Sequence, residues 1–324
     1  MQALILEQHD GKTLASVQAI EESQLPQGDV TIDIQWSSLN YKDALAITGK
    51  GKIIRNFPMV PGIDFAGVVH SSEDPRFHAG QQVLLTGWGV GENHWGGLSQ
   101  QARVKGDWLV AQPHGMDARQ AMIIGTAGFT AMLCVMALED AGVKPQDGEI
   151  VVTGASGGVG STAIALLHKL GYQVVAVSGR ESTHDYLRSL GADRIIGRDE
   201  FAETRPLEKQ LWAGAVDTVG DKVLAKVLAQ MNYGGCVAAC GLAGGFALPT
   251  TVMPFILRNV RLQGVDSVMT PAARRTQAWE RLVQDLPSSF YSQSATEITL
   301  AQAPEFAEKI MNNQIQGRTL VKVA

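Results

Sequence analysis

A loop rich in glycine, set between an apolar run and a helical pattern, constrains this chain most strongly. Residues 150–152 are apolar and typical of a buried strand, and glycines follow at positions 154, 157, 158 and 160. Residues 161–170 then carry apolar side chains at helical spacing. This order suits a dinucleotide pyrophosphate, because glycines let the backbone approach the phosphates and a helix N-terminus offers N–H groups. We therefore predict a dinucleotide-binding loop, with an ordinary glycine-rich turn as the alternative.

The end of the next predicted strand indicates which dinucleotide is bound. Residues 172–177 form that strand by pattern, and Ser178, Gly179 and Arg180 follow it. Sites for NAD usually place an acidic residue here to bind the ribose hydroxyls, whereas a guanidinium pairs with a phosphate through its planar fork. NADPH is therefore the preferred cofactor, with a solvated surface arginine as the alternative for Arg180. Arg198, which follows another short apolar run, is a candidate to stack on the adenine or to pair with the phosphate.

Composition and charge exclude several classes of protein. The 324 residues are enough for two domains, and a net charge of −5 without a basic cluster argues against nucleic-acid binding. The three cysteines make no disulfide framework, and the N-terminus lacks the features of a signal peptide, so we expect a cytoplasmic protein. An uncharged stretch at 121–138 contains glycine and threonine, and we expect a buried helix there rather than a membrane span.

The periodicity of the chain changes near its middle. Residues 29–36 alternate strictly between apolar and polar side chains, and short strands are predicted at 66–69, 82–85 and 98–104, which together indicate a β-rich, barrel-like domain. The pattern of the C-terminal residues 319–323 also predicts a strand. We expect the chain to return to the first domain with this strand. After residue 149 strands alternate with helices, which predicts a doubly wound parallel sheet. Its six expected strands are 150–153, 173–177, 194–196, 214–217, 235–240 and 261–265.

Several segments together carry a resemblance to a known superfamily. They are residues 40–43 (Asn-Tyr-Lys-Asp), 61–67, 125–131, the glycine loop, 216–217 and 317–321. Over essentially the whole chain they resemble the medium-chain dehydrogenase/reductase superfamily, in particular its zinc-free quinone oxidoreductase branch and the bacterial NADPH-dependent acryloyl-CoA reductases. The resemblance implies an α/β fold with a β-rich GroES-like catalytic domain at 1–122, a Rossmann NADPH-binding domain at 123–268, and a return to the catalytic domain at 269–324.

The residues themselves argue against a zinc site. A catalytic zinc needs three protein ligands, and the chain has no cysteine before Cys134. Zinc-dependent members of the superfamily carry Gly-His-Glu where this chain has Gly62, Ile63 and Asp64. His94 has no partner at ligand spacing, so we expect an ordinary loop or core histidine and no metal.

The resemblance implies reduction of the C=C bond of an α,β-unsaturated carbonyl compound, with acryloyl-CoA to propanoyl-CoA as the leading reaction. An NADPH:quinone oxidoreductase and a non-catalytic NADPH-binding protein are the alternatives. Without zinc, side chains or backbone N–H groups must stabilise the charge that develops on the carbonyl oxygen. Tyr41 is the first candidate, with Asn40 beside it; Tyr41 is also a candidate cofactor contact, and a buried structural tyrosine is the alternative. Asp43 and Asp64 are expected to shape turns and orient neighbours rather than act as acids.

The resemblance also implies further contacts with NADPH. The pyrophosphate would lie on Ser156, Gly157, Gly158 and Val159, while Leu242, Ile256, Ser267 and Arg318 would approach the nicotinamide end. Ordinary packing is the alternative for each, and an exposed position is the alternative for Arg318. The substrate is expected to be a small molecule, an acyl-CoA or another enone, and the branch implies a homodimer formed through the edges of the Rossmann sheets.

Overall fold

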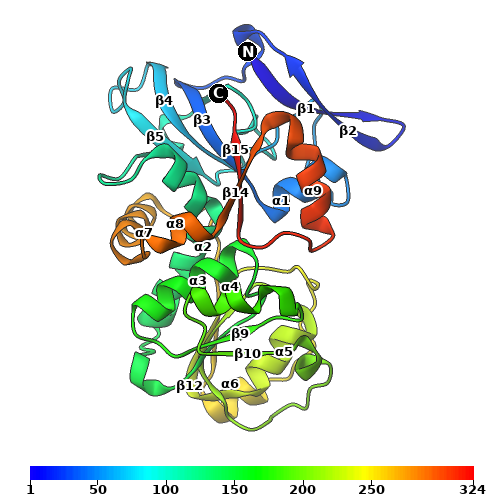
Figure 1. Cartoon of the computed structure of the whole chain (residues 1–324), viewed down its shortest axis with the longest axis vertical. Coiled ribbons are helices and arrows are strands. Elements are labelled where there is room, and N and C mark those ends of the chain that lie inside the picture. The colour runs from blue at the N-terminus through cyan, green and yellow to red at the C-terminus, as the bar shows by residue number, and fades with distance from the viewer. The chain divides into compact units, whose positions relative to one another are not determined.

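The computed structural model describes all 324 residues, which divide into two compact units (Figure 1). The first unit consists of Met1–Thr126, Ser267–Thr276 and Ser294–Ala324, and the second of Ala127–Asp266 and Gln277–Gln293. The first expected boundary, after residue 122, therefore differs by four residues, and the second, after residue 268, by two. Residues 277–293, which we expected in the first unit, lie in the second.

The second unit is built on a six-stranded parallel sheet in the order β10-β9-β8-β11-β12-β13. This is the strand order of a doubly wound dinucleotide-binding sheet, in which the order reverses beside the first strand. The predicted α/β fold is confirmed. The strands are β8 (Ile150–Val152), β9 (Val174–Val177), β10 (Arg194–Ile196), β11 (Trp212–Asp217), β12 (Met231–Ala239) and β13 (Arg261–Gly264).

The interior of this sheet explains why its strands read as unbroken apolar runs. Helices cover the faces of a parallel sheet, so every side chain of a central strand is buried, as in β8, β9 and β11. The core includes Val151, Val175, Trp212 and Val237. The shorter helices and turns of this unit are α3 (Gly158–Lys169), α4 (His184–Ser189), α5 (Asp221–Ala229), α6 (Met253–Arg258), α8 (Ser289–Gln293), η3 (Pro145–Asp147), η4 (Glu181–Thr183) and η5 (Arg198–Phe201).

The first unit contains a seven-stranded sheet and a separate two-stranded hairpin. The strand order of the sheet is β14-β15-β3-β4-β5-β7, and β6 pairs with β3 beside this path. The last strand, β15 (Arg318–Lys322), lies antiparallel to β3 (Val30–Leu39). The predicted return of the C-terminal strand is thus confirmed. The other strands are β1 (Gln2–His9), β2 (Lys12–Ala19), β4 (Asp64–Ser72), β5 (Gln82–Thr86), β6 (Gln101–Val104), β7 (Leu109–Ala111) and β14 (Ala295–Thr299), and the helices and turns are α1 (Tyr41–Thr48), α9 (Ala303–Met311), η1 (Glu22–Gln24), η2 (Gly106–Trp108) and η6 (Leu300–Gln302).

Two longer helices contain residues of both units, α2 (Ala118–Asp140) and α7 (Ala272–Asp285). Helix α2 is long and apolar enough to cross a membrane, but 94% of its apolar window is buried inside the protein. The predicted buried helix at 121–138 is therefore confirmed. Gly125 interrupts α2 with a φ of +52°, a backbone conformation that glycine adopts without the steric cost other residues meet.

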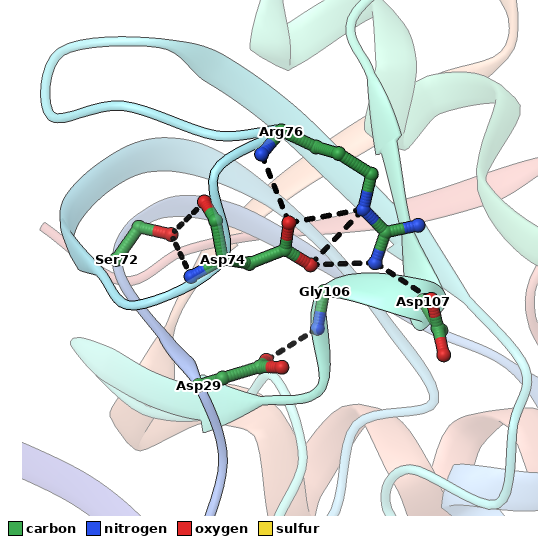
Figure 2. A network of polar contacts seen from close by, with 6 residues as sticks. All are labelled: Asp29, Ser72, Asp74, Arg76, Gly106 and Asp107. Carbon is green, nitrogen blue, oxygen red and sulfur yellow. Dashed lines mark hydrogen bonds and ion pairs between the residues drawn. The ribbon is translucent and has the colours of Figure 1, made fainter.

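A polar network fixes the connection between β4 and β5 in the first unit (Figure 2). Arg76 donates from Nη2 to Asp74 Oδ2 over 2.5 Å and to Asp107 Oδ1 over 2.6 Å, so one guanidinium binds this connection to η2. Side-chain hydrogen bonds from Arg76 lower the pKa of Asp74. Gly106 donates its backbone N–H to Asp29 Oδ1 over 2.6 Å, which attaches the same turn to the start of β3.

Candidate functional site

The glycine loop of the second unit joins β8 to α3. Gly154 has a φ of +58°, and a Cβ on Gly160 would come within 2.8 Å of the Ala155 Cα, so both positions need glycine for the fold of the turn. Gly157 is different, because its φ is −78° and a Cβ there would meet only the Gly154 oxygen, at 3.3 Å. No side chain caps the N-terminus of α3, which begins at Gly158 and Val159. The backbone N–H groups of this turn therefore form an open cradle of the kind that binds phosphate.

The predicted phosphate residues from two strands come together beside this cradle. Arg180 donates from Nη2 to Ser156 Oγ over 2.8 Å and from its backbone N–H to Ser178 Oγ over 3.3 Å. Ser178 also shares a 2.9 Å hydrogen bond with Thr183. The end of β9 is thus bound to the loop after β8, with the guanidinium of Arg180 at their junction.

Arg198 brings a second guanidinium to the same place. It begins η5, separated from the end of β10 by one residue, and a Cβ on Gly179 would lie 3.2 Å from Arg198 Cδ. Partial burial lowers the pKa of Arg180, and the charge of Arg198 lowers it further. Two adjacent guanidiniums repel each other, and a phosphate group would relieve this repulsion through charge-assisted hydrogen bonds. The backbone N–H cradle, together with Arg180 and Arg198, fits a dinucleotide that carries an extra phosphate on its adenosine ribose.

The carboxyl ends of β11 and β12 complete this edge of the sheet. Asp217 accepts hydrogen bonds from Thr153 Oγ1 over 2.7 Å and from the Gly220 N–H over 2.8 Å, and burial raises its pKa. Leu242, just beyond β12, is 61% exposed, and Ile256 on α6 is 72% exposed. Neither of these predicted cofactor residues packs into the core. Their predicted contact with the nicotinamide stays a prediction.

In the first unit, Arg318 and Asn40 lie in a buried polar network. Arg318, only 2% exposed, donates to Asn40 Oδ1 over 3.2 Å, to Ser38 Oγ over 2.8 Å and to the Ile123 carbonyl oxygen over 2.9 Å. Asn40 donates in turn to Asp64 Oδ2 over 2.9 Å. The exposed position that we kept open for Arg318 is wrong. Both ends of the Asn40 amide are engaged within the protein.

The two aspartates of this network organise the backbone around it. Asp43 accepts from the Asn40 N–H over 2.8 Å at the start of α1, and from the N–H groups of Gly62 and Ile63 over 3.1 and 3.0 Å. Asp64 accepts from the Thr126 N–H over 2.7 Å. Burial, and then the charge of Asp64, raises the pKa of Asp43 to about 7. These contacts are those of residues that orient turns and helix starts, as expected from the sequence.

Tyr41 is the first residue of α1 and follows this network directly. Its side chain is 41% exposed, so the buried structural tyrosine that we considered as an alternative is wrong. The fixed backbone of Asn40 and the helix start hold Tyr41 in place while its ring remains open to solvent or to a ligand.

A small cavity of about 60 Å³ opens in the same unit. The predicted cofactor residue Ser267 lines it, together with Lys42 and Glu92, which form an ion pair. The remaining lining residues are Ile63, Gly87, Gly89, Val90, Thr126 and Val268. From the sequence, Lys42 is predicted only as part of the Asn-Tyr-Lys-Asp segment and Glu92 is not predicted at all, because nothing in the sequence joins two residues that are fifty positions apart.

One wall of this cavity is held by a buried arginine that no sequence pattern predicts. Arg275, 2% exposed, donates to the Thr86 carbonyl oxygen over 2.8 Å and to that of Val268 over 3.2 Å. Its guanidinium lies 4.9 Å from the centre of the Trp88 ring. Trp88 has a φ of +58° between two glycines that also have positive φ, a conformation that costs a bulky residue about 1–2 kcal/mol. Such strain persists only where the surrounding structure enforces it, as Arg275 does here.

The structure contains no group of three or more His, Cys, Asp or Glu side chains close enough to hold a metal ion. His94 shares a 2.7 Å hydrogen bond between its Nε2 and the Arg103 carbonyl oxygen and lies edge-on to Trp108, and burial lowers its pKa. The expectation that His94 is an ordinary structural histidine is confirmed. The absence of a bound metal stays a prediction.

Two family descriptions match this chain. Residues 26–114 match the alcohol dehydrogenase GroES-like domain, and residues 158–285 match the zinc-binding dehydrogenase family. The chain is 85% identical over 323 residues to the probable acrylyl-CoA reductase AcuI of Escherichia coli (strain K12), with 100% of both chains covered. It is 54% identical to the acrylyl-CoA reductase AcuI of Ruegeria pomeroyi, with 98% of this chain and 97% of that protein covered.

Solved structures agree with these sequence matches. The yhdH oxidoreductase from Salmonella enterica in complex with NADP has a TM-score of 0.99 and 85% identity, with 100% of both chains covered. The Bacillus subtilis protein yhfP with NAD bound has a TM-score of 0.95 and 44% identity, with 99% of both chains covered.

Proposed function

The chain belongs to the medium-chain dehydrogenase/reductase family, and on that premise we propose that it reduces acryloyl-CoA to propanoyl-CoA with NADPH. The observation that carries the proposal is the 85% identity, over the full length of both chains, to a protein named as a probable acrylyl-CoA reductase. The second unit is then the NADPH-binding domain and the first unit the catalytic domain.

The residues of the second unit fit NADPH. The open N-terminus of α3 and the Gly157 position, where no side chain fills the cradle, suit the pyrophosphate. Arg180 and Arg198 suit the 2′-phosphate, because a planar guanidinium binds phosphate through two parallel hydrogen bonds. When bound, NADPH supplies the hydride for the double bond.

The residues of the first unit orient and polarise the substrate. Arg318, Asn40 and Asp64 fix the start of α1 through buried hydrogen bonds. Asn40 thereby acts as a positioning residue for Tyr41, whose exposed phenol remains our candidate for hydrogen bonding to the substrate or the cofactor. Ile63 and Asp64 offer no histidine or thiolate to a zinc ion, so we propose a reaction that needs no metal; elemental analysis of the active protein tests this.

We also propose that the protein is a homodimer. Strand β13 is the edge of the six-stranded sheet, and an unprotected edge is a template for pairing with another chain. The segment that precedes it exposes three large apolar side chains: Phe246 at 94%, Val252 at 64% and Leu257 at 56%. A second copy placed against this edge would cover them. The three free cysteines suit a reducing cytoplasm, where we propose that the protein works.

The assay of the proposed function measures NADPH oxidation by the purified protein with acryloyl-CoA, and identifies propanoyl-CoA by mass spectrometry. A parallel assay with a quinone separates the reductase from a quinone oxidoreductase. An absence of turnover with both acceptors, combined with tight NADPH binding, indicates a binding protein instead.

A further inference from the structure

Two charged side chains face one small cavity of the first unit that is otherwise apolar or neutral. Lys42, on α1, and Glu92, in the turn after Val90, line it and pair with each other. Ile63, Val90 and Val268 supply apolar walls, while Gly87 and Gly89 let the backbone approach closely. The cavity volume of about 60 Å³ has room for several water molecules, and so for a carbonyl group and the atoms next to it.

Like the Lys226–Glu208 and Arg281–Glu139 pairs, the Lys42–Glu92 pair is partly buried, and it lines the cavity. Its side chains are 33% and 20% exposed, whereas those of Lys50 and Glu308 are 46% and 52% exposed. Exposed pairs contribute little to stability, whereas partial burial makes a charge act more strongly on its neighbours. The pair therefore places a lysine ammonium, with its orientation set by Glu92, at the wall of a small, partly open cavity.

We propose that Lys42 is a catalytic residue that binds the thioester carbonyl oxygen of the acyl substrate in this cavity. The inference rests on the proposed reduction of acryloyl-CoA. Hydride adds to the β-carbon, the electron pair of the double bond moves toward the carbonyl carbon, and negative charge develops on the carbonyl oxygen. The Lys42 ammonium stabilises that charge, and the α-carbon then takes a proton drawn from water. Glu92 is the positioning residue that aims the ammonium.

The walls of the cavity are rigid in the way that such stabilisation requires. Charge stabilisation is effective when the donor is already in place before the reaction, so that nothing must reorganise. Trp88 donates its backbone N–H to the Val268 carbonyl oxygen over 3.0 Å, which joins the two sides of the wall. Arg275 binds the same two segments through Thr86 and Val268. The loop that carries Trp88 and Glu92 is thus bound to the segment around Val268 by two separate contacts.

The test compares Lys42→Met with Lys50→Met, a matched removal of a lysine from an exposed ion pair. We expect kcat/KM for acryloyl-CoA to fall about 100- to 1,000-fold in Lys42→Met, mostly through kcat, because a single lost donor has that effect. The Kd for NADPH, measured by fluorescence titration, should stay within about twofold, and Lys50→Met should behave as wild type.

Glu92→Gln is a second variant: it keeps the Lys42 ammonium but removes the carboxylate that orients it. We expect about a tenfold loss in kcat, with Glu308→Gln as its control, since misplaced donors lose part of their effect. Wild-type kinetics in Lys42→Met overturn the inference, and so does a large rise in the Kd for NADPH with an unchanged kcat. If the wild-type protein does not reduce acryloyl-CoA, the proposed function fails instead, so the two failures are distinguishable.

Discussion

Arg180 donates a hydrogen bond from Nη2 to Ser156 Oγ over 2.8 Å, and this contact binds the end of β9 to the glycine loop after β8. The two segments are more than twenty residues apart in the chain, but in a parallel sheet their carboxyl ends meet at one edge. The residue assigned to the 2′-phosphate therefore lies beside a residue assigned to the pyrophosphate. The choice of cofactor depends on this arrangement.

Arg180→Ala should weaken NADPH binding about 10- to 100-fold, since a hydrogen bond to a charged group contributes about 1.5–3 kcal/mol. Binding of NADH, which has no 2′-phosphate, should change little. Fluorescence titration with both nucleotides measures the two constants. Arg188→Ala removes an exposed arginine from the same unit and serves as the control. Equal losses for the two nucleotides would remove Arg180 from the 2′-phosphate site.

Gly157→Val should abolish dinucleotide binding in a protein that still folds. The backbone of Gly157 has an ordinary φ and an added Cβ would meet only the Gly154 oxygen, at 3.3 Å, a tight contact that a shift of a few tenths of an ångström relieves, so we expect the variant to fold. The branched side chain would instead occupy the place of the phosphates. Thermal unfolding and NADPH titration check the two halves of this prediction. Retained NADPH affinity would contradict the assignment of the loop.

Tyr41→Phe should slow turnover or weaken NADPH binding without affecting stability. The phenol is 41% exposed and begins a helix, so removal of its hydroxyl leaves the packing intact. A lost donor at a reacting oxygen lowers kcat by about 100-fold or more, whereas a lost cofactor contact raises the Kd for NADPH. Steady-state kinetics beside a binding titration separates the two. If neither constant changes, Tyr41 has no part in the reaction.

Asp43 should make stability depend on pH in the neutral range. Burial and the charge of Asp64 raise its pKa from 3.8 to about 7, so the folded protein keeps this proton where the unfolded chain has lost it. The contribution of the Asp43 carboxyl to the free energy of unfolding therefore falls as the pH rises toward 7. Relative to Asp43→Asn, which does not titrate, the wild type should lose about 2 kcal/mol of unfolding free energy between about pH 5.5 and pH 8. Urea unfolding at the two values measures the difference, and parallel curves for the two proteins would contradict the raised pKa.

Leu257→Asp should convert the proposed dimer into a monomer, because it places a charge on the exposed apolar surface beside the β13 edge. Light scattering after size exclusion should give the wild type twice the chain mass of 34.7 kDa and the variant the chain mass itself. Leu14→Asp changes an exposed leucine in the other unit and should leave the mass unchanged. A monomeric wild type would contradict the proposed assembly.

The strands of the second unit could be predicted from the sequence because both of their faces are buried, which leaves uninterrupted apolar runs such as 150–152 and 174–177. The predicted strands at 214–217 and 235–240 begin too late, because β11 starts at Trp212 and β12 at Met231. The β1–β2 hairpin was not predicted, because β2 alternates on a mostly exposed surface. The assignment of residues 277–293 to the second unit depends on tertiary contacts that leave no local pattern.

The residues of the candidate site, too, could be predicted from the sequence only in part. Ser156, Ser178 and Arg180 follow predicted strands, so the topology of a parallel sheet was enough to bring them together. Lys42 and Glu92 meet only through the fold of a loop with consecutive positive φ values, and no spacing rule connects them. No sequence pattern identified Arg275, which lies inside the protein and binds Thr86.

The most direct test of the account is the rate of nicotinamide oxidation by the purified protein with acryloyl-CoA, measured with NADPH and again with NADH. Fast turnover that forms propanoyl-CoA with NADPH, and much slower turnover with NADH, is the predicted result. A preference for NADH, or turnover with a quinone but not with acryloyl-CoA, would contradict the proposed function.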